Sequence, residues 1–306
     1  MFLNILEATS HREWLFLYNP AFMKIYFGFA LILILSFSTY NSRAQLNRHP
    51  HSITALTDSN AVNPNEVSIA INPRDKDNIV AVSMQYQMEQ SRRLITNFAY
   101  WSVDGGQSFN TVAHPNPDMR TQGDDTITFD AGGVAYHSFI SFRGLRQTNP
   151  EDAVNGILIN RSNNGGKSWT EAVPAVDHIN TVIPFEDKSW LVTDNSESKY
   201  RGNLYVSWTR FDVYGSDSPR DSTHIYFSRS TDGASSFSQP FRISDKGGNA
   251  MDDGNTVEGA VPAVGKNGEV YVVWSGPRGI EMDVSLDGGR SFGQDRFITK
   301  HPGGWD

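Results

Sequence analysis

Acidic residues stand at or just before the start of four apolar segments along this 306-residue chain. They are Glu66, the adjacent pair Asp124 and Asp125, Asp187, and Glu258. Arginines stand at or just beyond the end of the apolar segment that follows: Arg143, Arg210 and Arg278, with Arg92 and Arg93 in the matching loop of the first unit. Carboxyl pairs serve as acid and base in glycoside hydrolysis, and arginine clusters hold carboxylates through forked hydrogen bonds. The two sets together indicate a pocket for an acidic sugar.

Each charged residue has a candidate role in such a pocket. Asp124 or Asp125 would act as general acid and Glu258 as base. The three arginines would clamp a substrate carboxylate, while Glu66 and Asp187 would contact the rest of the substrate. Two other interpretations stay open. Charged residues at loop edges commonly pair with each other or are solvated, and the acidic ring could instead hold Ca²⁺, for which Asp252, Asp253 and Asn255 would be suitable oxygen ligands. No other cofactor is required.

Four successive units of short strands must position these residues, because apolar and β-branched runs alternate with turns and no helical periodicity occurs after residue 62. Their first three strands are expected at Val67–Ile71, Asn78–Met84 and Leu94–Trp101; at Thr126–Phe129, Val134–Phe142 and Gly156–Asn160; at Ser189–Thr193, Asn203–Trp208 and His224–Arg229; and at Ala260–Val264, Glu269–Trp274 and Ile280–Val284. A fourth, outer strand is clearest at Pro240–Ser244 and Asp295–Thr299. In antiparallel strands, the start of the first and the end of the second lie on one side. The acidic residues and the arginines should therefore meet at one mouth.

One short motif ends the third strand of every unit. Its copies read SVDGGQSF, SNNGGKSW, STDGASSF and SLDGGRSF. An Asp or Asn side chain can bond to backbone N–H groups of its own turn, glycine accepts a positive φ, and the final aromatic residue can plug the core. The residues expected to build these turns are Ser102, Asp104, Gly106 and Phe109; Ser162, Asn164, Gly166 and Trp169; Ser230, Asp232 and Phe237; and Ser285, Asp287, Gly289 and Phe292. These carboxylates are predicted to be structural.

The motif resembles the Asp box, or BNR repeat, of sialidase-like β-propellers, and the resemblance covers the chain from about Asn63 to its end. It implies an all-β propeller of four-stranded antiparallel blades, here at about residues 63–117, 118–177, 178–247 and 248–306. Members of that superfamily usually have six blades. The four visible blades are expected either to belong to an incomplete six-bladed propeller or to form an open array that needs a partner.

Before the propeller, the sequence is typical of an export signal. Lys24 precedes an apolar run, Ile25–Phe37, and small residues follow up to Ala44. This predicts a signal peptide over 23–44, cleaved after Ala44, with 1–22 an upstream extension and 45–62 a linker. The run is shorter than the roughly 20 residues that span a membrane. We expect a secreted or periplasmic protein with no membrane span after cleavage.

Composition excludes some partners. The net charge is −8 and no basic block occurs, which argues against nucleic acid. The chain has no cysteine, so it has neither disulfides nor a site for a lipoprotein anchor. Carbohydrate or glycoprotein is the expected partner class.

The resemblance implies exo-α-sialidase-type hydrolysis, but the sequence departs from it at one position. Sialidases carry an Arg-Ile-Pro signature near the first inner strand, whereas this chain reads NPNEVSIAINPRD there. The Tyr nucleophile and last arginine of that family come from late blades, which lie beyond the four blades visible here. Because these residues and the Arg-Ile-Pro signature are not seen, two alternatives remain beside a sialidase: a non-catalytic propeller that binds glycan or protein, and a two-carboxylate glycosidase of other specificity.

Overall fold

The computed structural model describes residues 62–89, 92–145 and 150–301, and these form four antiparallel sheets. The first sheet contains β1 (Val62–Asn72), β2 (Asp75–Glu89), β3 (Arg92–Ser102) and β4 (Asn110–Ala113). The second contains β5 (Thr121–Phe129), β6 (Ala135–Arg143), β7 (Val154–Ser162) and β8 (Val173–Ile179). The third contains β9 (Phe185–Thr193), β10 (Leu204–Phe211), β11 (Ser222–Ser230) and β12 (Phe241–Arg242), with β13 (Gly248–Asn249) also paired to β11. The fourth contains β14 (Glu258–Val264), β15 (Val270–Gly276), β16 (Gly279–Ser285) and β17 (Arg296–Thr299).

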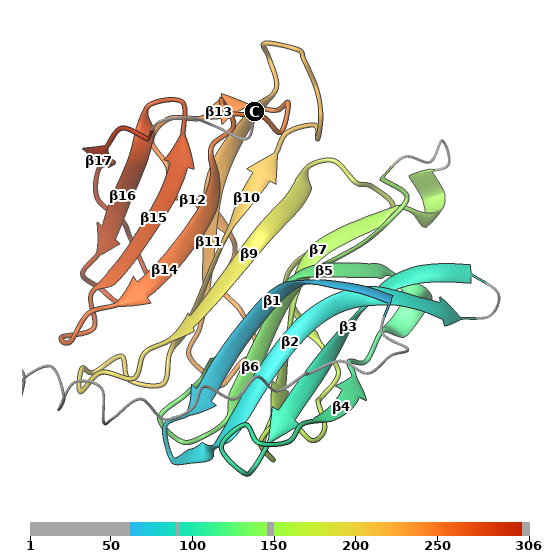
Figure 1. The fold of residues 1–306 in the computed structure, drawn as a ribbon. Coiled ribbons are helices and arrows are strands. Elements are labelled where there is room, and N and C mark those ends of the chain that lie inside the picture. Colours follow the sequence, from blue (N-terminus) through green and yellow to red (C-terminus); the bar gives the residue numbers. More distant parts are fainter. Residues whose placement is uncertain (1–61, 90–91, 146–149, 302–306) are drawn as a thin grey trace, which may run out of the picture. The chain divides into compact units, whose positions relative to one another are not determined.

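Strand order within every sheet follows the chain, so each unit is a meander whose first strand is the innermost (Figure 1). The all-β class and the four-stranded antiparallel units predicted from the sequence are confirmed. In the described ranges the helices are two single 3₁₀ turns, Pro117–Met119 and Pro150–Asp152, and no helix there is long and apolar enough to cross a membrane. The predicted signal peptide, its upstream extension and most of the linker lie outside the described residues.

Three apolar clusters hold each sheet to the next. Buried residues of β2, β3, β5 and β6 lie between the first and second sheets, and Ile157, Leu204, Val206 and Trp208 lie between the second and third. Tyr205, Phe227, Val270 and Trp274 lie between the third and fourth. Because the strands alternate side chains between two faces, a sheet with apolar residues on both faces can join two neighbours. The innermost strands β1, β5, β9 and β14 are consequently in contact in that order.

The four SxDxGxxF-like turns close β3, β7, β11 and β16 with one shared set of hydrogen bonds. In the first, Ser102 Oγ donates to Asp104 Oδ1 at 2.7 Å and accepts from Gly106 N at 3.0 Å. Ser108 N then donates to Asp104 Oδ1 at 3.0 Å. The Ser162–Asn164, Ser230–Asp232 and Ser285–Asp287 pairs repeat this pattern. These side chains are therefore occupied within their own turns, and hydrogen bonds to the ionised form lower the pKa of Asp104 and Asp232 to about 2.

Each later turn is also fastened to the sheet before it. Arg161 Nη1 donates to Gly233 O at 2.8 Å, and Arg229 Nη1 donates to Gly288 O at 2.9 Å. In the first sheet, Asn78 Nδ2 donates to Gly165 O of the second turn at 3.0 Å and replaces the arginine. The closing aromatic residues Trp169, Phe237 and Phe292 pack into the three apolar clusters in turn. The motif therefore joins sheets as well as closing hairpins.

Most of the first three strands of each sheet extend further than the apolar runs predicted, whereas the outer strands β12 and β17 are shorter than the predicted Pro240–Ser244 and Asp295–Thr299. β1 and β2 continue to Val62 and Glu89, since backbone pairing does not stop where the residues become polar. β8 runs to Ile179, past the expected unit boundary at 177, and β13 pairs with the third sheet although it lies in the segment expected to begin the fourth.

Candidate functional site

An irregularity in each innermost strand defines one end of the molecule. The pairing register shifts between Asn65 and Ser68 in β1, between Gly123 and Thr126 in β5, opposite Ser207–Thr209 in β9, and between Glu258 and Val261 in β14. Such a bulge inserts an extra residue and re-aims the neighbouring side chains. At the four bulges a residue has positive φ: Glu66 (53°), Asp124 (53°), Lys188 (50°) and Gly259 (74°). These equivalent positions form the mouth anticipated from strand order, at the end of β1 opposite its turn into β2.

Three of the four bulge residues are joined by hydrogen bonds between sheets. Asp124 N donates to Glu66 Oε2 at 2.8 Å, and Lys188 N donates to Asp124 Oδ2 at 3.1 Å. The Lys188 ammonium then bridges Glu66 Oε1 at 3.1 Å and Asp124 Oδ1 at 3.2 Å. Each carboxylate thus binds a backbone N–H of the next sheet's bulge, and one lysine lies between both. We call Glu66, Asp124 and Lys188 the bridge.

A cavity of about 270 Å³ adjoins the bridge on one side. Asp187 and Glu258 line it together with Asp252, Tyr214 and the apolar Ile140, Phe142, Leu145 and Phe185. Tyr214 Oη donates to Asp252 Oδ2 at 2.6 Å. We call this the acidic cavity, because carboxyl groups from all four sheets and from the loop before β14 line it.

Burial raises the pKa values of these carboxyls. The pKa of Glu258 rises to about 7, mainly because the residue is buried and secondarily because Asp252 is negative. Burial likewise raises the pKa of Asp124 and of Asp187 to about 6, and the negative charge of Asp187 adds to the rise at Asp124. Around neutral pH the acidic cavity therefore contains both a protonated carboxylic acid and an ionised carboxylate, the pair that acid–base chemistry requires.

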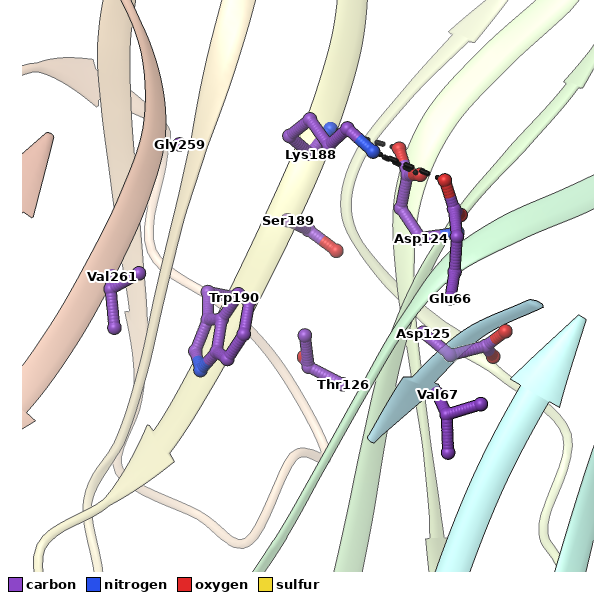
Figure 2. Close-up of a pocket in the computed structure, with 10 residues that line it drawn as sticks. All are labelled: Glu66, Val67, Asp124, Asp125, Thr126, Lys188, Ser189, Trp190, Gly259 and Val261. Carbon is purple, nitrogen blue, oxygen red and sulfur yellow. Dashed lines mark hydrogen bonds and ion pairs between the residues drawn. The ribbon is translucent and has the colours of Figure 1, made fainter. Parts of the chain in front are cut away.

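A second cavity, of about 240 Å³, adjoins the bridge along the innermost strands (Figure 2). Val67, Thr126, Ser189, Trp190 and Val261 line it, with Gly259 at its edge. The bridge residues line both cavities, and Lys188 is the only basic side chain among the described residues that line either one. We call this the Trp190 cavity.

Asp125 differs from its neighbour Asp124. Although it borders the Trp190 cavity, its carboxyl is fully buried and Oδ1 lies 2.5 Å from Nε2 of His137. The His137 ring continues through Asn160 to His114, with Nδ1 contacts of 3.2 and 3.1 Å. This polar chain lies between the first and second sheets. Since Asp125 is committed to it, the structure favours Asp124 over Asp125 as the carboxyl that can meet a substrate.

The structure does not bring Arg143, Arg210 and Arg278 together at the mouth, and none of them lines either cavity. Arg143 donates to the carbonyl oxygens of Asp118 and Asp152. Arg278 pairs with Glu281. Each guanidinium binds a nearby carboxylate or backbone carbonyl instead of facing the mouth. Strand order alone does not identify these partners.

Arg210 shows most clearly why. It forms an ion pair with buried Glu186 at 2.6 Å and lies 3.7 Å from the ring centroid of Tyr226. The same carboxylate accepts from Trp208 Nε1 at 2.6 Å and contacts His178 Nε2 at 2.8 Å. This arrangement uses the arginine to neutralise a buried charge. The side chains of Arg92 and Arg93 lie outside what the structure describes.

The candidate calcium ligands Asp252 and Asp253 form hydrogen bonds with different partners. Asp253 Oδ1 accepts from Asn249 Nδ2 at 3.0 Å and from Asn255 N at 2.7 Å, which makes a local turn. Asp252 instead bonds Tyr214 in the acidic cavity. Within residues 62–89, 92–145 and 150–301, no group of three or more His, Cys, Asp or Glu residues is arranged to hold a metal ion. A calcium site there stays a prediction.

Three residues of the site were missed from the sequence: Lys188, Trp190 and Tyr214. Lys188 directly follows predicted Asp187, and Trp190 lies in a predicted inner strand. For Lys188 and Trp190, their closeness to Asp187 in the sequence was the available signal, whereas Tyr214 lies in a loop and had none. The bulge at Lys188, which decides where both side chains point, leaves no sequence mark of its own.

Solved structures with the same fold include several carbohydrate-active enzymes. A protein of unknown function from Dyadobacter fermentans matches with a TM-score of 0.56 at 16% identity, over 79% of this chain and 73% of that one. An intramolecular trans-sialidase from Ruminococcus gnavus matches with a TM-score of 0.55 at 12% identity, over 81% and 73%. An α-L-arabinanase from Penicillium chrysogenum, complexed with arabinobiose, matches with a TM-score of 0.53 at 13% identity, over 78% and 69%.

These likenesses define the fold as that of the sialidase-like β-propellers. They do so at identities too low to transfer an activity. The chain spans about half the length of several other sialidases that it resembles, covering 46% to 56% of them. No protein-family model matches the sequence, and no curated protein matches it either.

Proposed function

We propose that this protein is a glycoside hydrolase that acts on a neutral glycan with the carboxyls of the acidic cavity. The observation that carries this proposal is the coexistence of Glu258, with its pKa raised to about 7, and the Asp124–Asp187 pair, with pKa values raised to about 6. Paired carboxyls with separated pKa values are what acid and base steps on a glycosidic bond need.

Glu258 is assigned the role of general acid. Its pKa is the highest of the three, so it keeps its proton at a pH where the others have lost theirs, and it can donate that proton to the leaving oxygen. The Asp124–Asp187 pair then supplies the ionised carboxylate that activates water or attacks the sugar. This reverses the roles expected from the sequence, which made Glu258 the base.

A neutral substrate is favoured over a sialoside because of the charges that line the site. Five carboxyls face the cavities, and their one basic neighbour, Lys188, already pairs with two of them. The arginines that would hold a sugar carboxylate are engaged elsewhere. A negatively charged sugar would meet net repulsion. Among proteins of the same fold, one described as an arabinanase complexed with arabinobiose is consistent with this class.

Export remains part of the proposal, since residues 23–44 have the pattern of a signal peptide. A secreted or periplasmic hydrolase would meet polysaccharide or glycoprotein directly. N-terminal sequencing of the protein recovered from its native host tests this, and an intact Met1 or Met23 terminus would contradict it.

The activity test compares aryl glycosides of neutral sugars, including aryl α-L-arabinofuranoside, with a fluorogenic sialoside. We expect turnover of a neutral glycoside only, with kcat/KM highest between about pH 6 and pH 7 because the base must be ionised and the acid protonated. Glu258→Gln and Asp187→Asn should each lower kcat at least a hundredfold, whereas the exposed control Glu171→Gln should not. Sialoside turnover alone would restore the sialidase alternative. A folded protein that binds these sugars without turnover would support the non-catalytic one.

A further inference from the structure

Trp190 is unusually exposed for its place in the fold. It lies in the innermost strand β9 between Ser189 and Leu191, both of which are buried, yet 44% of its own surface is accessible. The other described tryptophans are half-buried or buried, and Trp208 and Trp274 are almost completely so. The fold therefore does not use the indole of Trp190 as core, although the side chain is large and apolar enough for that.

Apolar side chains from two other sheets surround the same space. Val67 of β1 is 62% exposed and Val261 of β14 is 40% exposed, and both line the Trp190 cavity. Figure 2 shows the indole and Val261 on one side of this space, Val67 and Thr126 on the other, and the bridge at one end. The cavity thus combines an apolar wall with a charged end.

The bridge connects this space to the acidic cavity, because Glu66, Asp124 and Lys188 line both. Pockets for small ligands usually hold roughly 300–1,000 Å³. The two cavities, of about 240 and 270 Å³, are each smaller than that, but together they fall within the range. The dimensions suit a ligand that extends past the bridge into both.

We propose that the Trp190 cavity is a second sugar subsite, so that the substrate is an oligosaccharide or polysaccharide whose adjacent rings occupy the two cavities. This rests on the proposed function. A sugar ring has an apolar C–H face and a rim of hydroxyls. The indole offers a rigid flat face for the former. Glu66 and Asp124 can accept from the hydroxyls. Lys188, whose side chain is 42% exposed, retains a third N–H to donate.

Binding is measured on the Glu258→Gln protein, which holds the ligand without turning it over. The probes are arabinose, arabinobiose and arabinotetraose, and in parallel glucose, cellobiose and cellotetraose, each titrated to 10 mM while tryptophan fluorescence is recorded. In at least one series, we expect the di- and tetrasaccharide to shift the fluorescence and to bind at least tenfold more tightly than the monosaccharide. Adding Trp190→Ala should weaken tetrasaccharide binding at least tenfold and abolish the shift, and Trp190→Phe should retain part of the affinity.

Trp101→Phe is the matched control, because Trp101 is half-buried beneath Lys167 and lies outside both cavities. It should leave affinity and its dependence on length unchanged. Equal affinities for mono- and tetrasaccharide, equal affinities with and without Trp190→Ala, or no binding in either series would each overturn the subsite.

The hydrolase proposal and the subsite proposal can be refuted independently. Length-dependent binding through Trp190 without turnover by the wild-type protein would leave the subsite and remove the hydrolase. Turnover by the wild-type protein with a KM that Trp190→Ala does not change would support the hydrolase and refute the subsite.

Discussion

Replacing Glu258 with Gln should stabilise the protein at high pH. Glu258 is 2% exposed and has a pKa of about 7 in the folded protein, against an ordinary value of 4.5. Because the folded-state pKa is the higher one, folding takes up a proton between these values. The free energy of unfolding therefore falls as pH rises through this window and reaches its lower level above pH 7.

The size of the effect follows from the two pKa values. One pKa unit corresponds to about 1.4 kcal/mol, so the ionised side chain costs the fold about 3 kcal/mol at pH 8 and about 1 kcal/mol at pH 5. A Gln does not ionise, so this dependence disappears in the variant. Any cost of burying its amide is the same at both pH values and cancels in the comparison. Relative to wild type, Glu258→Gln should gain about 2–3 kcal/mol between pH 5 and pH 8.

Urea denaturation at pH 5 and pH 8 measures this, provided the m-value is the same for both proteins. The exposed control Glu171→Gln should show no such difference. Wild-type and Glu258→Gln stabilities that change in parallel with pH would refute the reasoning, because they would mean that Glu258 titrates near its ordinary value. The assigned general acid would then lack the property that recommended it. A stability gain joined to lost turnover is the exchange expected of a functional residue.

Three further substitutions probe the frame around the site. Lys188→Met removes the cation from the bridge and should cost about 1–2 kcal/mol at pH 8 but less at pH 5, where raised pKa values let the carboxyls protonate, as urea titrations would show. Gly166→Ala places a Cβ 2.7 Å from Val80 and should cost about 2–4 kcal/mol by thermal or urea unfolding, whereas Gly202→Ala, at nearly the same positive φ but in open space, should cost only about 1 kcal/mol. Trp208→Phe deprives a buried carboxylate of a donor and should destabilise by about 2 kcal/mol more than Trp274→Phe, whose buried indole N–H has no hydrogen-bond partner; equal losses would mean that only volume matters.

The fold could be predicted from the sequence because its determinants are local and repeated. Alternation of apolar residues specifies strands, and the recurring turn specifies where each third strand ends. Asp104 and its counterparts bond within their own loops, so their role follows from a few consecutive letters. The site depends instead on the register between strands. Asp124 and Asp125 are adjacent in sequence, yet one faces the cavities and the other faces His137 inside the protein.

The arginines illustrate the same limit. Arg210 was correctly expected near the end of the second strand of its unit, but its partner is set by cross-strand pairing, in which Arg210 lies directly opposite Glu186. The Glu186 carboxylate is fully buried, and its charge must be neutralised by a cation. Arg210 provides that cation and is therefore not free to bind a substrate. The order of residues in the sequence predicts how far along a strand a residue lies. It does not predict which residue of the neighbouring strand forms an ion pair with it.

The bulges explain why the positive-φ position carries a charged side chain on three sheets and no side chain on the fourth. A non-glycine residue at positive φ costs about 1 kcal/mol, and Glu66, Asp124 and Lys188 all accept that cost at equivalent positions. The first two offset it, since each carboxylate binds the N–H of the next bulge. Lysine has no acceptor, so this series cannot continue to β14.

At the fourth bulge the residue is Gly259, which adopts positive φ without strain, and a Cβ there would meet nothing within 4 Å. The space that a fourth charged side chain would fill therefore remains part of the Trp190 cavity. The change from carboxylate to lysine to glycine around the mouth thus leaves free volume beside Trp190 and Val261, where the second sugar ring is proposed to lie.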